Sequence, residues 1–158
     1  MSDRIKNRML ELGIELPEAP PPVATYVPAV RSGNYIYTSG QLPFVGGKLP
    51  VTGKVGEGSG LVPPPVATDL ARQCVLNALA AVAGLTGSLD SVARVVKVTG
   101  FVASDPAFTG QPAVLNGASE VLGDIFGAAG VHARSAVGVA VLPLDSPVEV
   151  ELIVEVVP

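Results

Sequence analysis

Few residues in this 158-residue sequence are of the types that catalytic or metal sites use, and each has a simpler interpretation. His132 is the only histidine, so a Ser-His-Asp triad would depend on it and a zinc site would need carboxylates beside it. Its position just before a predicted strand favours a partly exposed loop histidine. Cys74, the only cysteine, lies on the apolar face of a predicted helix, where a free cysteine packs as a small hydrophobic residue. The glycine-rich run 53–60 lacks the Gly-Lys-Ser/Thr end of a phosphate-binding loop and is interpreted as a surface loop.

The last two predicted strands carry the other residues of interest. Residues 134–142 and 148–157 both alternate as strands do, and the five residues 143–147 between them predict a hairpin. In the register that this turn favours, Val141 lies opposite Val148, and one face of the hairpin is made of valines. We expect this valine face to meet the helices.

The opposite face of the predicted hairpin carries small residues, one arginine and three glutamates: Arg134, Glu149, Glu151 and Glu155. Such a face does not suit the core of a monomer, but it can line an oligomer interface or a polar pocket. The register also places Arg134 opposite Glu155, so a cross-strand ion pair is an alternative explanation for the arginine. It places Glu149 six residues along the hairpin from Arg134, which is about 20 Å at ~3.3 Å per residue. One small ligand would then contact both side chains only if they came from adjacent subunits.

The apolar patterns around these residues predict a single α+β domain over residues 1–158. The expected order is helix, two strands, helix, strand, helix and two strands, giving a mostly antiparallel sheet with both large helices on one face. The predicted elements are an N-terminal helix at about 3–13, strands at 26–31 and 34–42, a helix at 68–83, a strand at 92–102, a helix that begins at 112, and strands at 134–142 and 148–157. Residues 43–65 form a long Gly- and Pro-rich loop, of a length that is often functional.

Composition suggests that the chain associates with copies of itself. Hydrophobic residues make up 48% of the sequence, so there is material for a core. Charged residues make up 15%, against ~25% in an average soluble domain. A monomer with so few charges would expose apolar surface, and we therefore expect a homo-oligomer.

Charge and segment patterns exclude several classes of protein. The net charge of −4 argues against a nucleic-acid-binding protein, which needs clustered Lys and Arg. The longest uncharged stretch, 73–89, contains Gln, Asn, Thr, Ser and two glycines and does not suit a membrane span. The first residues lack the apolar segment of a secretory signal, and one cysteine allows no intramolecular disulfide. We therefore expect a cytoplasmic protein that is not associated with membranes.

Two segments of the sequence together resemble a known family. The run ARSAVGVAVLP over 133–143, followed by VEVE at 148–151, resembles the C-terminal signature of the YjgF/RidA reactive-intermediate deaminases, also called the endoribonuclease L-PSP family. So does YTSGQ at 37–41, preceded by Tyr26. The resemblance extends from about residue 20 to the C-terminus and indicates a longer member of the family.

This resemblance implies a homotrimer with a chorismate-mutase-like fold, in which the sheets form an inner barrel and the helices lie outside. Clefts between subunits would hold the sites. The best-known members hydrolyse enamine and imine intermediates, such as 2-aminoacrylate and its imine tautomer, to 2-keto acids and ammonia without a cofactor or metal. Other members are described as ribonucleases, translation inhibitors or chaperone-like proteins. The alternatives for this chain are therefore a non-catalytic trimer that binds small carboxylates and, less favoured by its acidic charge, a ribonuclease.

The resemblance also assigns roles to two charged residues. Arg134 would bind the substrate carboxylate, a task that suits its planar fork because two parallel charge-assisted hydrogen bonds can form. Glu149 would orient or deprotonate the attacking water. A solvated strand position is the alternative for Glu149.

Four further positions would complete the substrate pocket. Tyr26 would close it, while Ser39, Gly40 and the backbone of Ala136 would contact the imine end of the substrate. Strand packing is the alternative for Tyr26, and turn formation before Gly40 is the alternative for Ser39. Ala136 stands where the family often has cysteine, which has little consequence if only its backbone takes part. The N-terminal helix and the 43–65 loop are additions to the family pattern, and the loop would reshape the mouth of the cleft.

Overall fold

Five strands form one sheet in the computed structural model, which describes residues 3–158. In spatial order they are β1 (Ala29–Ser32), β2 (Tyr35–Thr38), β5 (Val148–Val156), β3 (Val92–Ala103) and β4 (Ala133–Val139). All neighbours are antiparallel except β3 and β4, which run parallel. The α+β class and the mostly antiparallel sheet predicted from the sequence are confirmed.

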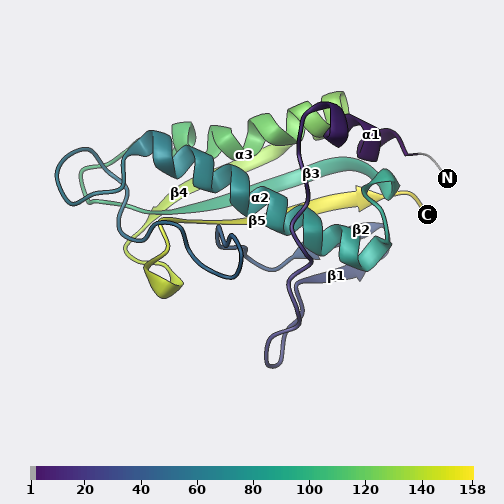
Figure 1. The fold of residues 1–158 in the computed structure, drawn as a ribbon, viewed down its shortest axis with the longest axis horizontal. Coiled ribbons are helices and arrows are strands. Elements are labelled where there is room, and N and C mark those ends of the chain that lie inside the picture. Colours follow the sequence, from purple (N-terminus) through teal and green to yellow (C-terminus); the bar gives the residue numbers. More distant parts are fainter. Residues whose placement is uncertain (1–2) are drawn as a thin grey trace.

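The helices cover one face of this sheet. They are α1 (Arg4–Glu11), α2 (Pro64–Thr86) and α3 (Gln111–Phe126), with short 3-10 turns η1 (Leu89–Ser91), η2 (Gly127–Gly130) and η3 (Pro143–Asp145). Figure 1 shows α2 and α3 lying side by side across the sheet, with α1 near the C-terminal end of α3. The core lies between these helices and the inward side chains of β3 and β5, which are almost entirely valine and leucine. The other face of the sheet has no cover within residues 3–158.

The long core helix α2 extends beyond its predicted bounds of 68–83 at both ends. Its first turn contains Pro64, a position that proline tolerates because the missing N–H has no helical partner there. The helix continues through Gly84 and ends at Gly87, whose φ of 81° and N–H bond to the Ala83 carbonyl form the C-cap. By length and composition α2 could span a membrane, but 67% of its most apolar window is buried, as in the core helix of a globular domain.

The predicted hairpin between residues 134 and 157 is wrong. β4 and β5 both pair with β3, on its two opposite edges, so β3 lies between them. The chain from β3 through α3 to β4 is a strand–helix–strand crossover, which places the two strands parallel. The short connection 143–147 resembles a hairpin loop, and this resemblance concealed the crossover.

The corrected pairing reverses the predicted faces of β4. Arg134 lies beside Val98 of β3, which is fully buried under the helices, so the arginine points to the helix side. Val137 and Val141, which were predicted to meet the helices, are 44% and 66% exposed. In β5 the valine side is buried and the glutamates point to the uncovered face, as predicted.

The first two strands are shorter than predicted, and the loop after them is tied to the sheet. β1 begins at Ala29, which leaves Tyr26 in a turn outside the strand. Residues 43–65 contain no strand, but the Val55 amide donates to the Ala103 carbonyl and the Val55 side chain is fully buried. The Lys54 ammonium forms an ion pair with Asp145 in η3. The long loop is therefore an ordered extension at the C-terminal end of β3.

Candidate functional site

Arg134 at the start of β4 is held against the first half of α3. Its Nη1 donates to Asn116 Oδ1 at 2.9 Å and to Ser119 Oγ at 3.1 Å, and its Nη2 donates to the Pro112 carbonyl at 3.2 Å. The side chain is half-buried. The alternative explanation for Arg134, an ion pair with Glu155, does not hold, since Glu155 lies on β5 beside Arg94 and Tyr35. Three acceptors from one helix therefore fix the position of the guanidinium.

These contacts leave part of the Arg134 guanidinium open. The group has five N–H donors, of which three are used by Asn116, Ser119 and Pro112. Nε–H and one Nη2–H have no acceptor among residues 3–158. Because Nε and Nη2 share one edge of the guanidinium, these donors suit the two oxygens of a carboxylate.

Glu149 lies on the uncovered face of the sheet, in β5 beside Phe101 of β3. Its side chain is half-buried, and no hydrogen-bond donor among residues 3–158 reaches its carboxylate. Burial raises the pKa of the Glu149 carboxyl above its ordinary value, and the charge of Glu151 raises this pKa further. A carboxylate with a raised pKa is a better proton acceptor near neutral pH, which is the property of a general base.

Gly40 lies directly against the Glu149 carboxylate because of an irregularity between β2 and β5. Tyr37 opposes Ile153, whereas Gln41 opposes Val150, so the register shifts by one residue across Ser39 and Gly40. A Cβ atom on Gly40 would lie 2.0 Å from Glu149 Oε1. The absence of a side chain at residue 40 thus makes room for the carboxylate.

Ser39 connects this bulge to the segment that carries Tyr26. The Ser39 hydroxyl donates to the Val27 carbonyl at 2.7 Å, and its amide donates to the Pro28 carbonyl at 2.7 Å. Tyr26 is 57% exposed, in a turn that projects from the sheet. We call the adjacent residues Ser39, Gly40 and Glu149 the carboxylate cluster. Tyr26 belongs to the segment before β1 that Ser39 holds by these hydrogen bonds.

The predicted site residues fall into two groups on opposite faces of the sheet. Ala136 belongs with Arg134, because both lie on β4 and Ala136 pairs with Gly100 on the helix side. Arg134 and Glu149 are separated by β3, and their partners Val98 and Phe101 are three residues apart along it. Strand spacing puts their Cα atoms roughly 14 Å apart, with the side chains pointing away from each other. Within one chain, a small substrate cannot contact both groups.

Sequence reasoning missed the residues that surround Arg134. Ser119 Oγ lies 2.9 Å from His132 Nε2, so Asn116, Ser119 and His132 form, with Arg134, what we call the arginine cluster. Their proximity depends on the β3–α3–β4 crossover, which the hairpin prediction excluded. The available signal was the spacing of residues 116 and 119, which places them on the same side of a helix.

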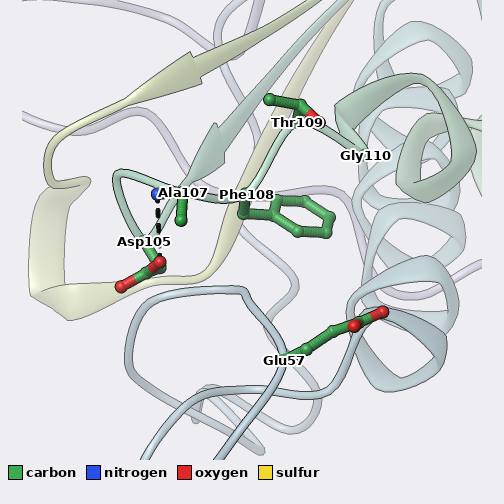
Figure 2. A pocket seen from close by; sticks show the side chains of 6 residues that line it. All are labelled: Glu57, Asp105, Ala107, Phe108, Thr109 and Gly110. Carbon is green, nitrogen blue, oxygen red and sulfur yellow. Dashed lines mark hydrogen bonds between the residues drawn. The ribbon is translucent and has the colours of Figure 1, made fainter.

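A cavity of about 430 Å³, lined by no residue of either cluster, lies between the 43–65 loop and the segment after β3. Figure 2 shows its lining side chains: Glu57, Asp105, Ala107, Phe108, Thr109 and Gly110. The Asp105 carboxylate accepts a hydrogen bond from the Ala107 amide at 3.0 Å. Within the described part of the chain, no group of three or more His, Cys, Asp or Glu side chains could hold a metal ion.

Comparisons with known proteins agree on one family. The family described as "YjgF/chorismate_mutase-like, putative endoribonuclease" matches residues 6–156. Protein TCP17 of Trypanosoma cruzi is 43% identical over 157 residues, which cover 98% of this chain and 95% of that protein. A 2-iminobutanoate/2-iminopropanoate deaminase of Dermatophagoides farinae is 34% identical, over 89% of this chain and 93% of that one. The crystal structure of Atu1372 from Agrobacterium tumefaciens, a protein of unknown function, superimposes with a TM-score of 0.88 at 46% identity, covering 98% of this chain and 94% of that chain.

Proposed function

The chain belongs to the YjgF/RidA family, and from this premise we propose that it hydrolyses reactive enamine and imine intermediates to 2-keto acids and ammonia without a cofactor. The proposed substrates are of the 2-aminoacrylate and 2-iminopropionate type. The observation that carries the proposal is Glu149, a half-buried carboxyl with a raised pKa that lies against the bare backbone of Gly40. The 34% identity to a protein named as an imine deaminase supports the same reaction class.

Arg134 binds the substrate carboxylate in this proposal. Its open donors, Nε–H and one Nη2–H, match the two carboxylate oxygens, while α3 fixes the rest of the group. Because the guanidinium is already fixed, substrate binding costs less entropy. The bound substrate then holds its imine carbon at a set distance from the Glu149 carboxylate. Ala136, two residues along β4, lies on the same side of the strand and offers its backbone to the bound substrate.

Glu149 acts on water. As the water oxygen bonds to the imine carbon, the C=N electron pair moves to nitrogen and Glu149 accepts a water proton. The protonated Glu149 returns this proton to the nitrogen of the resulting carbinolamine. The C–N bond then breaks and ammonia leaves with the electron pair. As the keto C=O bond forms, Glu149 accepts the proton of the carbinolamine hydroxyl. A protonated imine is already electrophilic, so positioning and one carboxylate are sufficient.

The remaining positions shape the imine end of the pocket. Gly40 and Ser39 present backbone beside Glu149, and Tyr26 covers the pocket from its exposed turn. Because Ser39 donates its hydroxyl proton to Val27, its role here is to offer lone pairs and to hold the Tyr26 segment.

We propose further that each site is shared between two chains of a homotrimer. Arg134 and Glu149 lie on opposite faces of one sheet, so a site that uses both requires a second copy. The uncovered face exposes apolar side chains that a neighbouring copy could bury, among them Val30, Tyr37 and Val137. Light scattering should give three times the 16.0 kDa chain mass at micromolar concentration, and a stable monomer would contradict the shared site.

The direct test of activity is to generate 2-iminopropionate in situ and to follow its loss with and without the protein. Accelerated loss with formation of pyruvate supports the proposal. No acceleration together with measurable keto-acid binding would favour the second candidate, a trimer that binds small carboxylates through Arg134. RNA cleavage without imine hydrolysis would favour the ribonuclease activity that the family description names. We propose a cytoplasmic location, which cell fractionation with a specific antibody would test.

The shared site has its own test, by complementation. Arg134→Ala and Glu149→Ala chains, each inactive alone, are unfolded and refolded together. In a mixed trimer of two chains of one kind and one of the other, one interface joins an intact Arg134 to an intact Glu149. Each mixed trimer should therefore recover at most about a third of wild-type activity. Inactive mixed trimers beside fully refolded wild-type protein would contradict a shared site.

A further inference from the structure

A chain of hydrogen bonds extends behind the arginine that binds the carboxylate. Arg134 Nη1 lies 3.1 Å from Ser119 Oγ, Ser119 Oγ lies 2.9 Å from His132 Nε2, and His132 Nδ1 lies 2.6 Å from the Gly130 carbonyl oxygen. All three side chains are half-buried, so solvent competes only partly for these contacts. The reaction proposed above uses Arg134 alone from this group.

The direction of each proton in this chain follows from its two ends. A carbonyl oxygen can only accept, so His132 Nδ1 carries its proton and donates it to Gly130. In the neutral imidazole, Nε2 is then an acceptor, and the Ser119 hydroxyl must donate to it. The Ser119 oxygen consequently presents its lone pairs to Arg134, whose N–H groups can only donate.

Without His132, the Ser119 hydroxyl would have another partner. A serine in the middle of a helix commonly donates to the carbonyl four residues earlier, which here belongs to Leu115. The imidazole instead draws the Ser119 proton toward Nε2, on the side where β4 begins. Ser119 is thereby kept as an oriented acceptor for Arg134.

We propose that Ser119 and His132 are positioning residues, which hold Arg134 so that its Nε and Nη2 edge stays open to the substrate carboxylate. This inference rests on the proposed function of Arg134. The Ser119 hydroxyl oxygen accepts one of the two Nη1 protons of Arg134. This bond keeps the guanidinium from turning its Nη1 and Nη2 side toward the ligand in place of its Nε and Nη2 edge. His132 acts through Ser119, and neither residue contacts the substrate.

The test measures binding of 2-oxobutanoate, a stable keto acid, by calorimetry, together with KM and kcat for 2-iminopropionate. Ser119→Ala should raise the Kd and KM about fivefold and leave kcat within twofold, because one hydrogen bond to a charged group is lost from a binding residue. Ser119→Thr keeps the hydroxyl and should restore wild-type values. Ser91→Ala is the matched control, since the Ser91 hydroxyl donates to the Ser88 carbonyl far from Arg134 and its loss should change neither constant. In an Arg134→Lys background, Ser119→Ala should add nothing.

A spectroscopic signature tests the same chain without a ligand. Because His132 is the only histidine, its ring nitrogens give one pair of ¹⁵N resonances, and these should report the Nδ1–H tautomer. Ser119→Ala should shift the Nε2 resonance and leave Nδ1 nearly unchanged. The opposite tautomer in the wild type would overturn the role of His132.

The outcomes separate this inference from the proposed function. If wild-type protein binds 2-oxobutanoate and Ser119→Ala binds it equally well, the positioning role is wrong and the function of Arg134 stands. An equal loss in the Arg134→Lys background would also overturn it, because Ser119 would then act elsewhere. If wild-type protein neither binds keto acids nor hydrolyses imines, both proposals fail. Should Ser119→Ala unfold, as circular dichroism would reveal, His132→Gln must raise the Kd by itself or the inference fails.

Discussion

Arg134 and Glu149 differ in how many hydrogen-bond partners their own chain gives to their side chains. Three acceptors from α3, those of Asn116, Ser119 and Pro112, bind the Arg134 guanidinium and leave Nε–H and one Nη2–H without an acceptor among residues 3–158. Glu149, in contrast, lies against Gly40, which has no side chain, and near the like-charged Glu151, and no donor among residues 3–158 reaches its oxygens. The Arg134 guanidinium is therefore held in position within a single chain. The Glu149 carboxylate, by contrast, is left to bind a water, a substrate or a second copy of the chain.

This difference carries a thermodynamic consequence. A carboxyl whose pKa is raised in the folded state binds its proton more tightly there than in the unfolded chain. Its favourable contribution is present below the unfolded pKa and is lost as pH rises through the folded pKa. Ionised Glu149 thus opposes folding at neutral pH, as expected of a group retained for chemistry rather than stability.

Glu149→Gln is expected to have the largest effect on activity. The amide cannot accept the water proton, so kcat for 2-iminopropionate should fall by roughly 10²-fold or more. The thermal midpoint at pH 7 should not fall and should rise slightly, because the ionised carboxylate is gone. Glu151→Gln, on the same strand and face, is the matched control and should retain a plateau kcat within about twofold. A Glu149→Gln protein with wild-type kcat would remove Glu149 from the reaction.

Arg134→Lys is expected to be next in size. An ammonium cannot form the two-oxygen contact or keep all three bonds to α3, so binding should weaken by roughly 2 kcal/mol, about 30-fold in kcat/KM. The comparison with Glu149 predicts that this loss falls mainly on KM, since Arg134 holds the substrate and Glu149 moves protons. The control is Arg72→Lys on the exposed side of α2. Wild-type kinetics in Arg134→Lys would contradict the carboxylate-binding role.

Gly40→Ala tests whether the carboxylate cluster depends on a missing side chain. The new Cβ would lie 2.0 Å from Glu149 Oε1, so the carboxylate must move, and we expect a roughly tenfold fall in kcat. Gly123→Ala is the control, because its Cβ would meet open space in the last turn of α3, where alanine is a better helix former than glycine. Equal kcat values for the two variants would mean that Glu149 needs no fixed position.

The sequence predicted the family, the α+β class and the position of most elements, because these depend on local patterns. β3 with its β-branched run and α3 with its first-turn proline agree with prediction to within a residue or two. The parallel pairing of β3 with β4 was not predictable from the same patterns. Strand alternation defines two faces but not the neighbour, and a five-residue connection suits both a hairpin and a crossing past the end of β3.

That single error determined what could be predicted of the site. Glu149 was placed on the correct face, because the strict alternation of β5 holds whichever strand is its neighbour. Arg134 was placed on the wrong face, and its contacts with Asn116 and Ser119 could not be predicted. The conclusion that Arg134 and Glu149 are too distant for one substrate now rests on their opposite faces, and the predicted register no longer supports it.

The smallest expected effect concerns pH and uses Glu151→Gln as the probe. Glu149 must be ionised to accept a proton from water, so activity should fall as pH falls through its pKa. Glu151 is one of the two causes that raise this pKa, after burial. Removing its charge should lower the pKa of Glu149 and move the acidic limb of the kcat/KM profile to lower pH, with the plateau unchanged. High salt should move the wild-type limb in the same direction, because it screens the repulsion between two partly exposed carboxylates. The effect of burial on the Glu149 pKa, by contrast, does not depend on salt. If neither Glu151→Gln nor salt moves the acidic limb of the profile, the whole rise in this pKa comes from desolvation by the strands around Glu149.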